Sequence, residues 1–171
     1  MLMGLEARVF RRVVRSLAAG VTVVTTRDLR GHPWGLTATA ACLVSWEPPL
    51  LLACIERTAD CYPAFAEAEA FTVNVLREDQ ERLSRHFASK DTGKFDAVSW
   101  RKGDTGAPIL EGVLAHVECR VTAQYPAGDH TIFLGEAVAA DAATSGEPST
   151  PLVYFRGSYT RLAAEVSPPR P

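Results

Sequence analysis

The sequence predicts a mainly β fold, an antiparallel barrel with short helices that cover its ends. Three observations predict it. At least five segments are rich in β-branched or alternating residues, most of them are joined by turn-forming residues, and only three short segments have helical periodicity. The length of 171 residues suits one domain, and no internal repeat divides the chain.

The first predicted element is a helix over residues 6–19, which Gly20 follows as a stop signal. Apolar residues recur there at spacings of three and four: Val9, Phe10, Val13, Val14 and Leu17. The polar side of the helix carries four arginines: Arg8, Arg11, Arg12 and Arg15. We interpret this side as a solvent-facing helix surface, or as a local basic patch that contacts a polyanion.

Two strands follow, over residues 21–26 and about 34–44, on either side of a turn rich in Asp, Gly and Pro. The second strand is small and rich in threonine, with Thr37 and Thr39 on one face and Ala38 and Ala40 on the other. Small side chains on a strand allow another backbone or molecule to approach closely.

The pair Pro48-Pro49 then interrupts the chain, and residues 50–55 form a continuous apolar run that predicts a buried strand. A short helix reaching Ala68 is expected next, capped by Thr58 or Asp60.

Residues 71–76 predict a strand and residues 79–88 a helix, after which the polar stretch 89–106 predicts a long surface loop. Residues 113–125 and 131–140 predict a hairpin, and residues 152–155 a last strand. We expect a core over about 8–162 and a flexible tail over 163–171.

The composition excludes several classes of protein. Hydrophobic residues at 47% and charged residues at 22% are typical of a globular chain, and a net charge of −2 gives no general attraction to nucleic acid. P-loop, dinucleotide-fold and serine-hydrolase motifs are absent from the sequence, and the four histidines lack metal-ligand spacing. The four cysteines are interpreted as reduced core residues. No secretory signal or apolar run of membrane-spanning length is found, which favours the cytoplasm.

Nine short blocks stand out along the chain: GVTVVTT at 20–26, GLTA at 35–38, PPL at 48–50, FTVNVL at 71–76, FAS at 87–89, KF at 94–95, GAPIL at 106–110, GDH at 128–130 and YFRG at 154–157. Through these blocks the chain resembles, from about Phe10 to Leu162, the short-chain flavin reductases, the reductase components of two-component flavin-dependent monooxygenases. Any single block would be weak evidence, but nine blocks in the family's order are not.

The resemblance implies an antiparallel split β-barrel of the FMN-binding, Greek-key type that forms a homodimer. It implies hydride transfer from NADH or NADPH to FMN or FAD, and a separate monooxygenase that takes the reduced flavin. The alternative is a flavin- or haem-binding split barrel without catalysis, since a fold does not fix a function. An oxidase of the pyridoxamine-phosphate type is disfavoured because the sequence has no clear set of basic residues for a substrate phosphate.

The resemblance also implies the flavin site. Thr37, Ala38, Thr39 and Ala40 match the segment that lies along the flavin, although the family has Asn and Ser where Thr39 and Ala40 stand, so flavin affinity or preference is expected to differ. The alternative for this segment is a strand packed closely on a neighbour. Further matching residues reach the ribityl chain and phosphate or close over them: Cys54, Glu56, Arg57, Thr58, Phe87, Ala88, Ser89 and Lys90. Phe87 alone would be interpreted as a core residue, and Arg57 as an exposed turn residue.

His130 matches the family histidine beside the nicotinamide and flavin rings, and the resemblance therefore implies a catalytic role. Hydride transfer needs close, aligned rings more than an acid or a base, so we expect His130 to position them. It could also donate a proton near the reduced flavin. The alternative is a turn histidine held by Asp129. Tyr159 is expected near the same opening.

Overall fold

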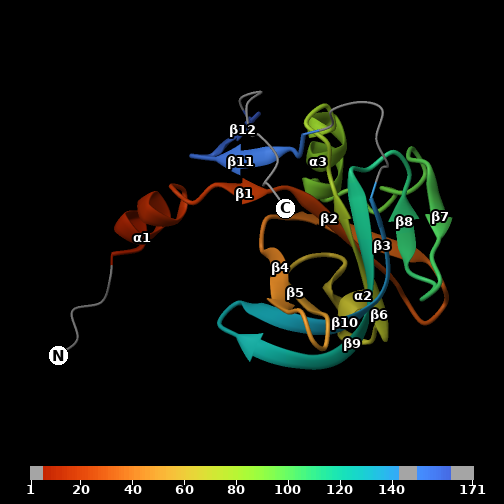
Figure 1. Ribbon diagram of the computed structural model, residues 1–171. Helices are drawn as coiled ribbons and strands as arrows, with labels where there is room; N and C mark the ends of the chain where they lie inside the picture. Colours follow the sequence, from red (N-terminus) through yellow and green to blue (C-terminus); the bar gives the residue numbers. More distant parts are fainter. Residues whose placement is uncertain (1–5, 143–149, 163–171) are drawn as a thin grey trace.

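A seven-stranded antiparallel sheet forms the centre of the computed structural model, which describes residues 6–142 and 150–162 (Figure 1). The strand order is β3-β2-β6-β9-β10-β5-β4. The strands are β2 (Thr22–Arg27), β3 (Pro33–Ala38), β4 (Ala41–Ser45), β5 (Leu50–Glu56), β6 (Ala70–Val75), β9 (Ala115–Ala127) and β10 (His130–Ala142). The predicted mainly β class is confirmed. Within the described residues no pairing joins the edge strands β3 and β4, so the sheet is not a closed barrel.

The two edges of the sheet nevertheless converge, because β3 and β4 are consecutive and only Thr39 and Ala40 separate them. The carbonyl of Ala40 accepts a hydrogen bond from the Cys54 amide at 2.9 Å, which fixes this corner against β5. The prediction of one strand over about 34–44 is therefore wrong. The alternation of small residues continues through the corner, and only the change of partner strand reveals the break.

Five short strands lie outside the large sheet. They are β1 (Ala19–Gly20), β11 (Val153–Phe155) and β12 (Ser158–Thr160) in one small sheet, and β7 (Trp100–Lys102) with β8 (Pro108–Leu110) in another. β7 lies inside the predicted loop 89–106, so that prediction is wrong in part. The buried carboxylate of Glu118 on β9 orders the turn between β7 and β8, because it accepts hydrogen bonds from the amides of Asp104 and Thr105 at 3.2 and 2.8 Å.

The three predicted helices are present as α1 (Ala7–Val14), α2 (Tyr62–Ala66) and α3 (Glu81–Ala88). α2 starts after Cys61 without a side-chain cap, so the caps predicted at Thr58 or Asp60 are wrong. α1 ends five residues earlier than predicted and projects from the body (Figure 1). It buries none of its residues, so it does not cover an end of the sheet within this one chain. No helix in the described part of the chain is long and apolar enough to cross a membrane.

Apolar side chains form two buried clusters. The first packs Phe65 of α2 and Phe133 of β10 between the sheet and α2, and the second packs Phe87 of α3 on Leu76 and Leu110. Gly135 of β10 has no room for a side chain, because a Cβ there would lie 2.7 Å from the Phe71 ring. Glycine at this position thus leaves space for the Phe71 ring of β6 against β10.

All four cysteines are free. Cys61 and Cys119 are buried, and desolvation raises the pKa of the Cys61 thiol to about 11 and that of Cys119 to about 12. Cys54 is half-buried, and desolvation also raises its pKa. Cys42 is exposed on the edge strand β4, so the prediction of core cysteines is wrong at this position.

Candidate functional site

A cleft of about 410 Å³ opens between β3, the turn after β5 and the end of α3. Its volume lies within the range of small-molecule sites, about 300–1,000 Å³. Seven predicted cofactor-binding residues line it: Thr37, Glu56, Thr58, Phe87, Ala88, Ser89 and Lys90. Leu36, Ala59, Asp60, Cys61 and Lys94 complete the lining. The structure therefore brings together residues that are more than fifty positions apart in the sequence.

The β3 wall of the cleft is tied to α3 by a side chain. The Thr37 hydroxyl donates to the carbonyl of Ser84 at 2.6 Å, and the Thr22 hydroxyl donates to the carbonyl of Ala38 at 2.8 Å. Ala38 is buried, whereas Thr39 and Ala40 are exposed at the corner between the two edge strands. Of the predicted segment 37–40, only Thr37 lines the cleft.

The residues at the end of β5 contact both the cleft and the hairpin turn between β9 and β10. The Thr58 hydroxyl donates to the Glu56 carboxylate at 2.7 Å on the cleft side. Arg57 is outside the lining, and both of its contacts go to the hairpin turn. Its amide donates to the carbonyl of Asp129 at 2.9 Å, and its guanidinium donates to the carbonyl of Gly128. Arg57 thus fastens the turn of the β9–β10 hairpin to the end of β5.

His130 begins β10 directly after this turn, in which Gly128 has a φ of 63°. Its Nδ1 lies 2.6 Å from the Asp129 carboxylate, and this hydrogen bond is the main cause of a lowered pKa for Asp129. An ionised carboxylate can only accept, so Nδ1 carries the proton and Nε2 points elsewhere. His130 pairs with Glu56 across the two strands, and cross-strand partners share a face of the sheet. His130 therefore lies beside the cleft, on the Glu56 side, rather than in its lining.

The α3 wall supplies an aromatic side chain and two ammonium groups. Phe87 is fully buried and meets Phe95 edge to face at 5.2 Å, so its interpretation as a core residue is correct. Ser89 follows α3, and its hydroxyl donates to the carbonyl of His86 at 2.8 Å. Lys90 is exposed at the same end of the helix.

Lys94 is the functional candidate that the sequence did not single out. It is only 9% exposed, and its ammonium donates to the carbonyl of Phe87 at 3.0 Å and reaches that of Gly35 at 3.5 Å. The His86 ring holds the loop in place through the Lys94 carbonyl at 2.7 Å. Lys94 could have been predicted as a site residue from its position beside Phe95 in the KF block, although the surrounding stretch indicates a solvated loop.

Two further predicted residues, Cys54 and Tyr159, also lie outside the lining of the cleft. Cys54 is on β5 two residues before Glu56, behind the corner at Ala40. Tyr159 is on β12, where its hydroxyl lies 2.8 Å from the Ser84 hydroxyl and its ring packs on Tyr154 at 5.2 Å. Tyr159 is connected to the cleft through Ser84 and Thr37.

The donors of the cleft suit an aromatic molecule that carries a phosphate. Lys90 and Lys94 supply positive charge, and Ser89 and Thr58 supply hydroxyls. The other lining includes the apolar side chains of Leu36, Ala59 and Ala88, the neutral thiol of Cys61 and the carboxylates of Glu56 and Asp60. A flavin nucleotide has an apolar ring that suits the apolar side chains and an anionic arm that suits the two lysines.

Comparison with known proteins gives the same family. The model of the flavin reductase like domain matches residues 14–163. The chain is 45% identical over 161 residues to the flavin reductase (NADH) of Kitasatospora aureofaciens, covering 93% of this chain and 83% of the relative. It is 34% identical over 167 residues to the flavin-dependent monooxygenase reductase subunit HsaB of Rhodococcus jostii, covering 98% and 84%.

A solved structure agrees with these relatives over nearly all of the chain. The NADH:FAD oxidoreductase SgcE6 of Streptomyces globisporus, in complex with NAD and FAD fragments, superposes with a TM-score of 0.86 at 36% identity and covers 98% of this chain and 99% of that chain. The resemblance drawn from the sequence blocks is therefore confirmed, and the chain belongs to the flavin reductase like domain family.

Proposed function

We propose that this chain is an NAD(P)H:flavin oxidoreductase that reduces FMN or FAD and supplies the reduced flavin to a separate monooxygenase. The observation that carries the proposal is the cleft, which has Lys90 and Lys94 in its lining and His130 beside it, as the cross-strand partner of Glu56. The flavin supplies the ring that accepts the hydride, and the nicotinamide supplies the hydride. The protein has to bind both and align them.

The cleft residues bind the flavin's anionic arm in this proposal. Lys94 and Lys90 neutralise the phosphate. The hydroxyls of Ser89 and Thr58 donate to His86 and Glu56, so they accept hydrogen bonds from the hydroxyls of the ribityl chain. The corner at Thr39 and Ala40 leaves the backbone accessible to the ring, because neither residue has a bulky side chain. This assignment places the ring toward the corner and the phosphate toward α3.

His130 orients the nicotinamide in this proposal. Asp129 and the Nδ1 hydrogen bond fix the plane of the imidazole and direct Nε2 away from the turn. Hydride transfer depends on the distance and alignment of two rings, so a side chain of fixed orientation is more useful here than a mobile one. Arg57 supports this role because it holds the turn to β5.

We further propose that the fold is a split barrel and that two chains form a homodimer. Convergence of the edge strands at Thr39 and Ala40 supports the barrel. Exposed apolar side chains support the dimer, because water-facing patches of this kind mark interaction sites. They are Phe10, Val13, Val14 and Leu17 on and after α1, and Leu43, Val44 and Trp46 on and after β4, and Trp46 is 84% exposed. A second copy that covers both patches would give α1 the core contacts it lacks.

The test follows loss of the reduced nicotinamide absorbance when purified protein is mixed with NADH or NADPH, with and without FMN, FAD or riboflavin. We expect oxidation that depends on added flavin. Absence of flavin-dependent oxidation with both nicotinamides would refute the reductase and favour the flavin- or haem-binding alternative. Molecular mass in solution, measured by light scattering, tests the dimer separately.

A further inference from the structure

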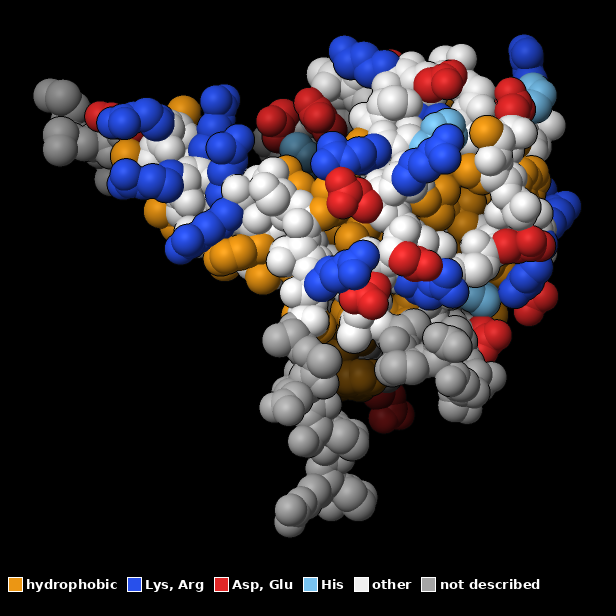
Figure 2. All heavy atoms as spheres, turned by 90° about the horizontal axis from the view of Figure 1, so that it is seen from above, with side chains coloured by type: hydrophobic (Ala, Val, Ile, Leu, Met, Phe, Trp, Pro, Cys, Tyr) orange, Lys and Arg blue, Asp and Glu red, His pale blue; other side chains and the backbone are white. Residues whose placement is uncertain are grey.

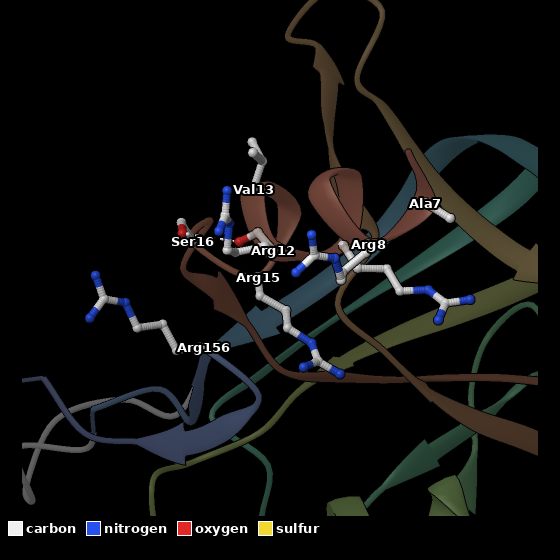
Figure 3. A pocket seen from close by; sticks show the side chains of 8 residues that line it. Ala7, Arg8, Arg12, Val13, Arg15, Ser16 and Arg156 are labelled. Atoms are coloured by element: carbon white, nitrogen blue, oxygen red, sulfur yellow. Dashed lines mark hydrogen bonds between the residues drawn. The ribbon is translucent and has the colours of Figure 1, made fainter. Parts of the chain in front are cut away.

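A second hollow lies away from the cleft, beside the projecting helix α1. It has a volume of about 970 Å³ and five arginines in its lining, namely Arg8, Arg11, Arg12, Arg15 and Arg156. Figure 3 shows Arg12 and Arg15 reaching from the helical segment and Arg156 from the turn between β11 and β12. The two segments are joined by a hydrogen bond from the Arg156 amide to the Arg15 carbonyl at 2.8 Å.

The arginines of α1 occupy one side of the helix. At about 100° per residue, Arg8, Arg11, Arg12 and Arg15 fall within an arc of about 100°. Phe10, Val13 and Val14 lie on the opposite side, where they are 42–60% exposed. A second copy on the apolar side would therefore leave the arginine side facing solvent.

The positive charge in this hollow is almost uncompensated. Arg8 has a partner, Glu6, at 4.0 Å, where both side chains are highly exposed. In the described part of the chain the other four arginines form no ion pair, and no acidic residue lines the hollow. Like charges three and four residues apart destabilise a helix, so the arrangement has a cost that a bound anion would relieve.

The backbone conformation at Arg156 supports the same conclusion. Arg156 is the one non-glycine residue with positive φ in the described ranges, at 52°. Glycine adopts this conformation without strain, whereas arginine does not. The guanidinium of Arg156 therefore lies at the rim of the hollow although the backbone conformation at this position favours glycine.

The remainder of the protein is acidic. The whole chain has a net charge of −2, so the rest of it carries −7 when the five arginines are set aside. Figure 2 shows Lys and Arg side chains gathered on the projecting arm that α1 forms, while acidic and basic side chains are mixed over the body. An anionic partner is repelled by the body and attracted to the arm, which favours a compact acidic surface over an extended polyanion such as duplex DNA.

We propose that the arginine face of α1, together with Arg156, docks an acidic surface of a separate protein. Given the proposed function, on which this step rests, that partner is the monooxygenase that takes the reduced flavin. Arginine suits the role because its planar guanidinium pairs with carboxylates through two hydrogen bonds and is common at protein interfaces. Docking at the arm would hold the flavin acceptor near the reductase without occupying the cleft, because none of the five arginines lines it.

The test measures the affinity of the full chain for a fluorescent decaglutamate peptide by anisotropy, at low salt and at 0.3 M salt. The test variant is Arg8→Gln, Arg11→Gln, Arg12→Gln and Arg15→Gln combined, in which glutamine keeps the helix propensity. The matched control replaces four exposed basic residues elsewhere: Arg30→Gln, Arg101→Gln, Lys102→Gln and Arg161→Gln. Both variants change the net charge equally, and their melting temperatures are compared first.

We expect the test variant to bind the peptide about tenfold or more weakly, because four exposed charge pairs each contribute up to a few fold, and we expect the control to stay within about threefold. Equal losses in both variants would overturn the proposal, as would tighter binding to a DNA duplex or to phosphatidylserine vesicles than to the peptide. NADH oxidation with FMN should be the same in the test variant and the wild type. Failure of that reaction in the wild type would count against the reductase, whereas unchanged peptide binding in the test variant would count against the docking face.

Discussion

Replacement of Lys94 by methionine tests how the cleft recognises its ligand. Methionine nearly preserves the volume of the buried lysine stem and removes the ammonium, which donates to the carbonyls of Phe87 and Gly35. If Lys94 also meets the flavin phosphate, FMN should bind the variant more weakly, while riboflavin, which has no phosphate, should bind almost as before.

The size of the effect follows from the environment of the lysine. Its side chain is 9% exposed, so little water screens the ammonium. A hydrogen bond to a charged group contributes about 1.5–3 kcal/mol, and about 1.4 kcal/mol is a tenfold change in affinity. Lys94→Met should therefore weaken FMN binding by about ten- to a hundredfold and riboflavin binding by less than about threefold.

The assay determines the dissociation constant of FMN and of riboflavin from the quenching of flavin fluorescence, in the wild type and in Lys94→Met. Lys102→Met is the matched control, because Lys102 is exposed on β7 and far from the lining. The melting temperature of each variant separates a binding effect from loss of the fold. Equal weakening of both flavins in Lys94→Met would refute a phosphate contact at this lysine.

Three further predictions concern the turn, the core and a buried carboxylate. His130→Ala should lower kcat/KM for NADH by about ten- to a hundredfold. Its melting temperature should be unchanged, and its affinity for FMN should stay within about twofold of the wild type. An unfolded variant would favour a purely structural role for His130. Gly135→Ala should lower the free energy of unfolding by about 1–3 kcal/mol, since its Cβ would meet the Phe71 ring. The control Gly20→Ala should not lower it, because the space around Gly20 is open. Equal denaturation midpoints for the two variants would refute the packing argument. Burial opposes ionisation of Glu118, but hydrogen bonds from the turn after β7 outweigh it and lower its pKa from 4.5. A lowered folded-state pKa gives stability that is present above pH 4.5 and is lost as the pH falls through the folded-state pKa. Below pH 4.5 the melting temperature of the wild type should therefore drop more steeply than that of Glu118→Gln. Parallel curves of melting temperature against pH would contradict this.

The long elements of the fold were predictable from the sequence, and the short ones were not. The hairpin predicted at 113–125 and 131–140 is present as β9 and β10, because a dozen alternating residues carry a clear period. β7 and β12 each have three residues, which is too few for a period to show. The break between β3 and β4 also escaped prediction, since it depends on which strand each half pairs with.

The candidate site was predictable where local sequence and family resemblance agree. Thr37, Thr58 and Ser89 were found in this way, and all three line the cleft. Lys94 was missed because a lysine in a polar stretch is normally solvated. Its burial depends on the His86 hydrogen bond and on the packing of Phe95 against Phe87, which are contacts that no sequence pattern states.

The end of β5 explains how one short segment can serve two binding events. Glu56 ends β5 and lines the cleft with Thr58 of the following turn, while the guanidinium of Arg57 between them donates to the hairpin turn. In the proposed function, Arg57 supports the nicotinamide side through the turn that carries His130. The contact with the flavin phosphate that the resemblance implies for Arg57 stays a prediction. Because Glu56 is also the cross-strand partner of His130, a shift of this strand end would move the cleft and the histidine together. In the proposed function, the alignment of the two rings, on which hydride transfer depends, therefore rests on the register between β5 and β10.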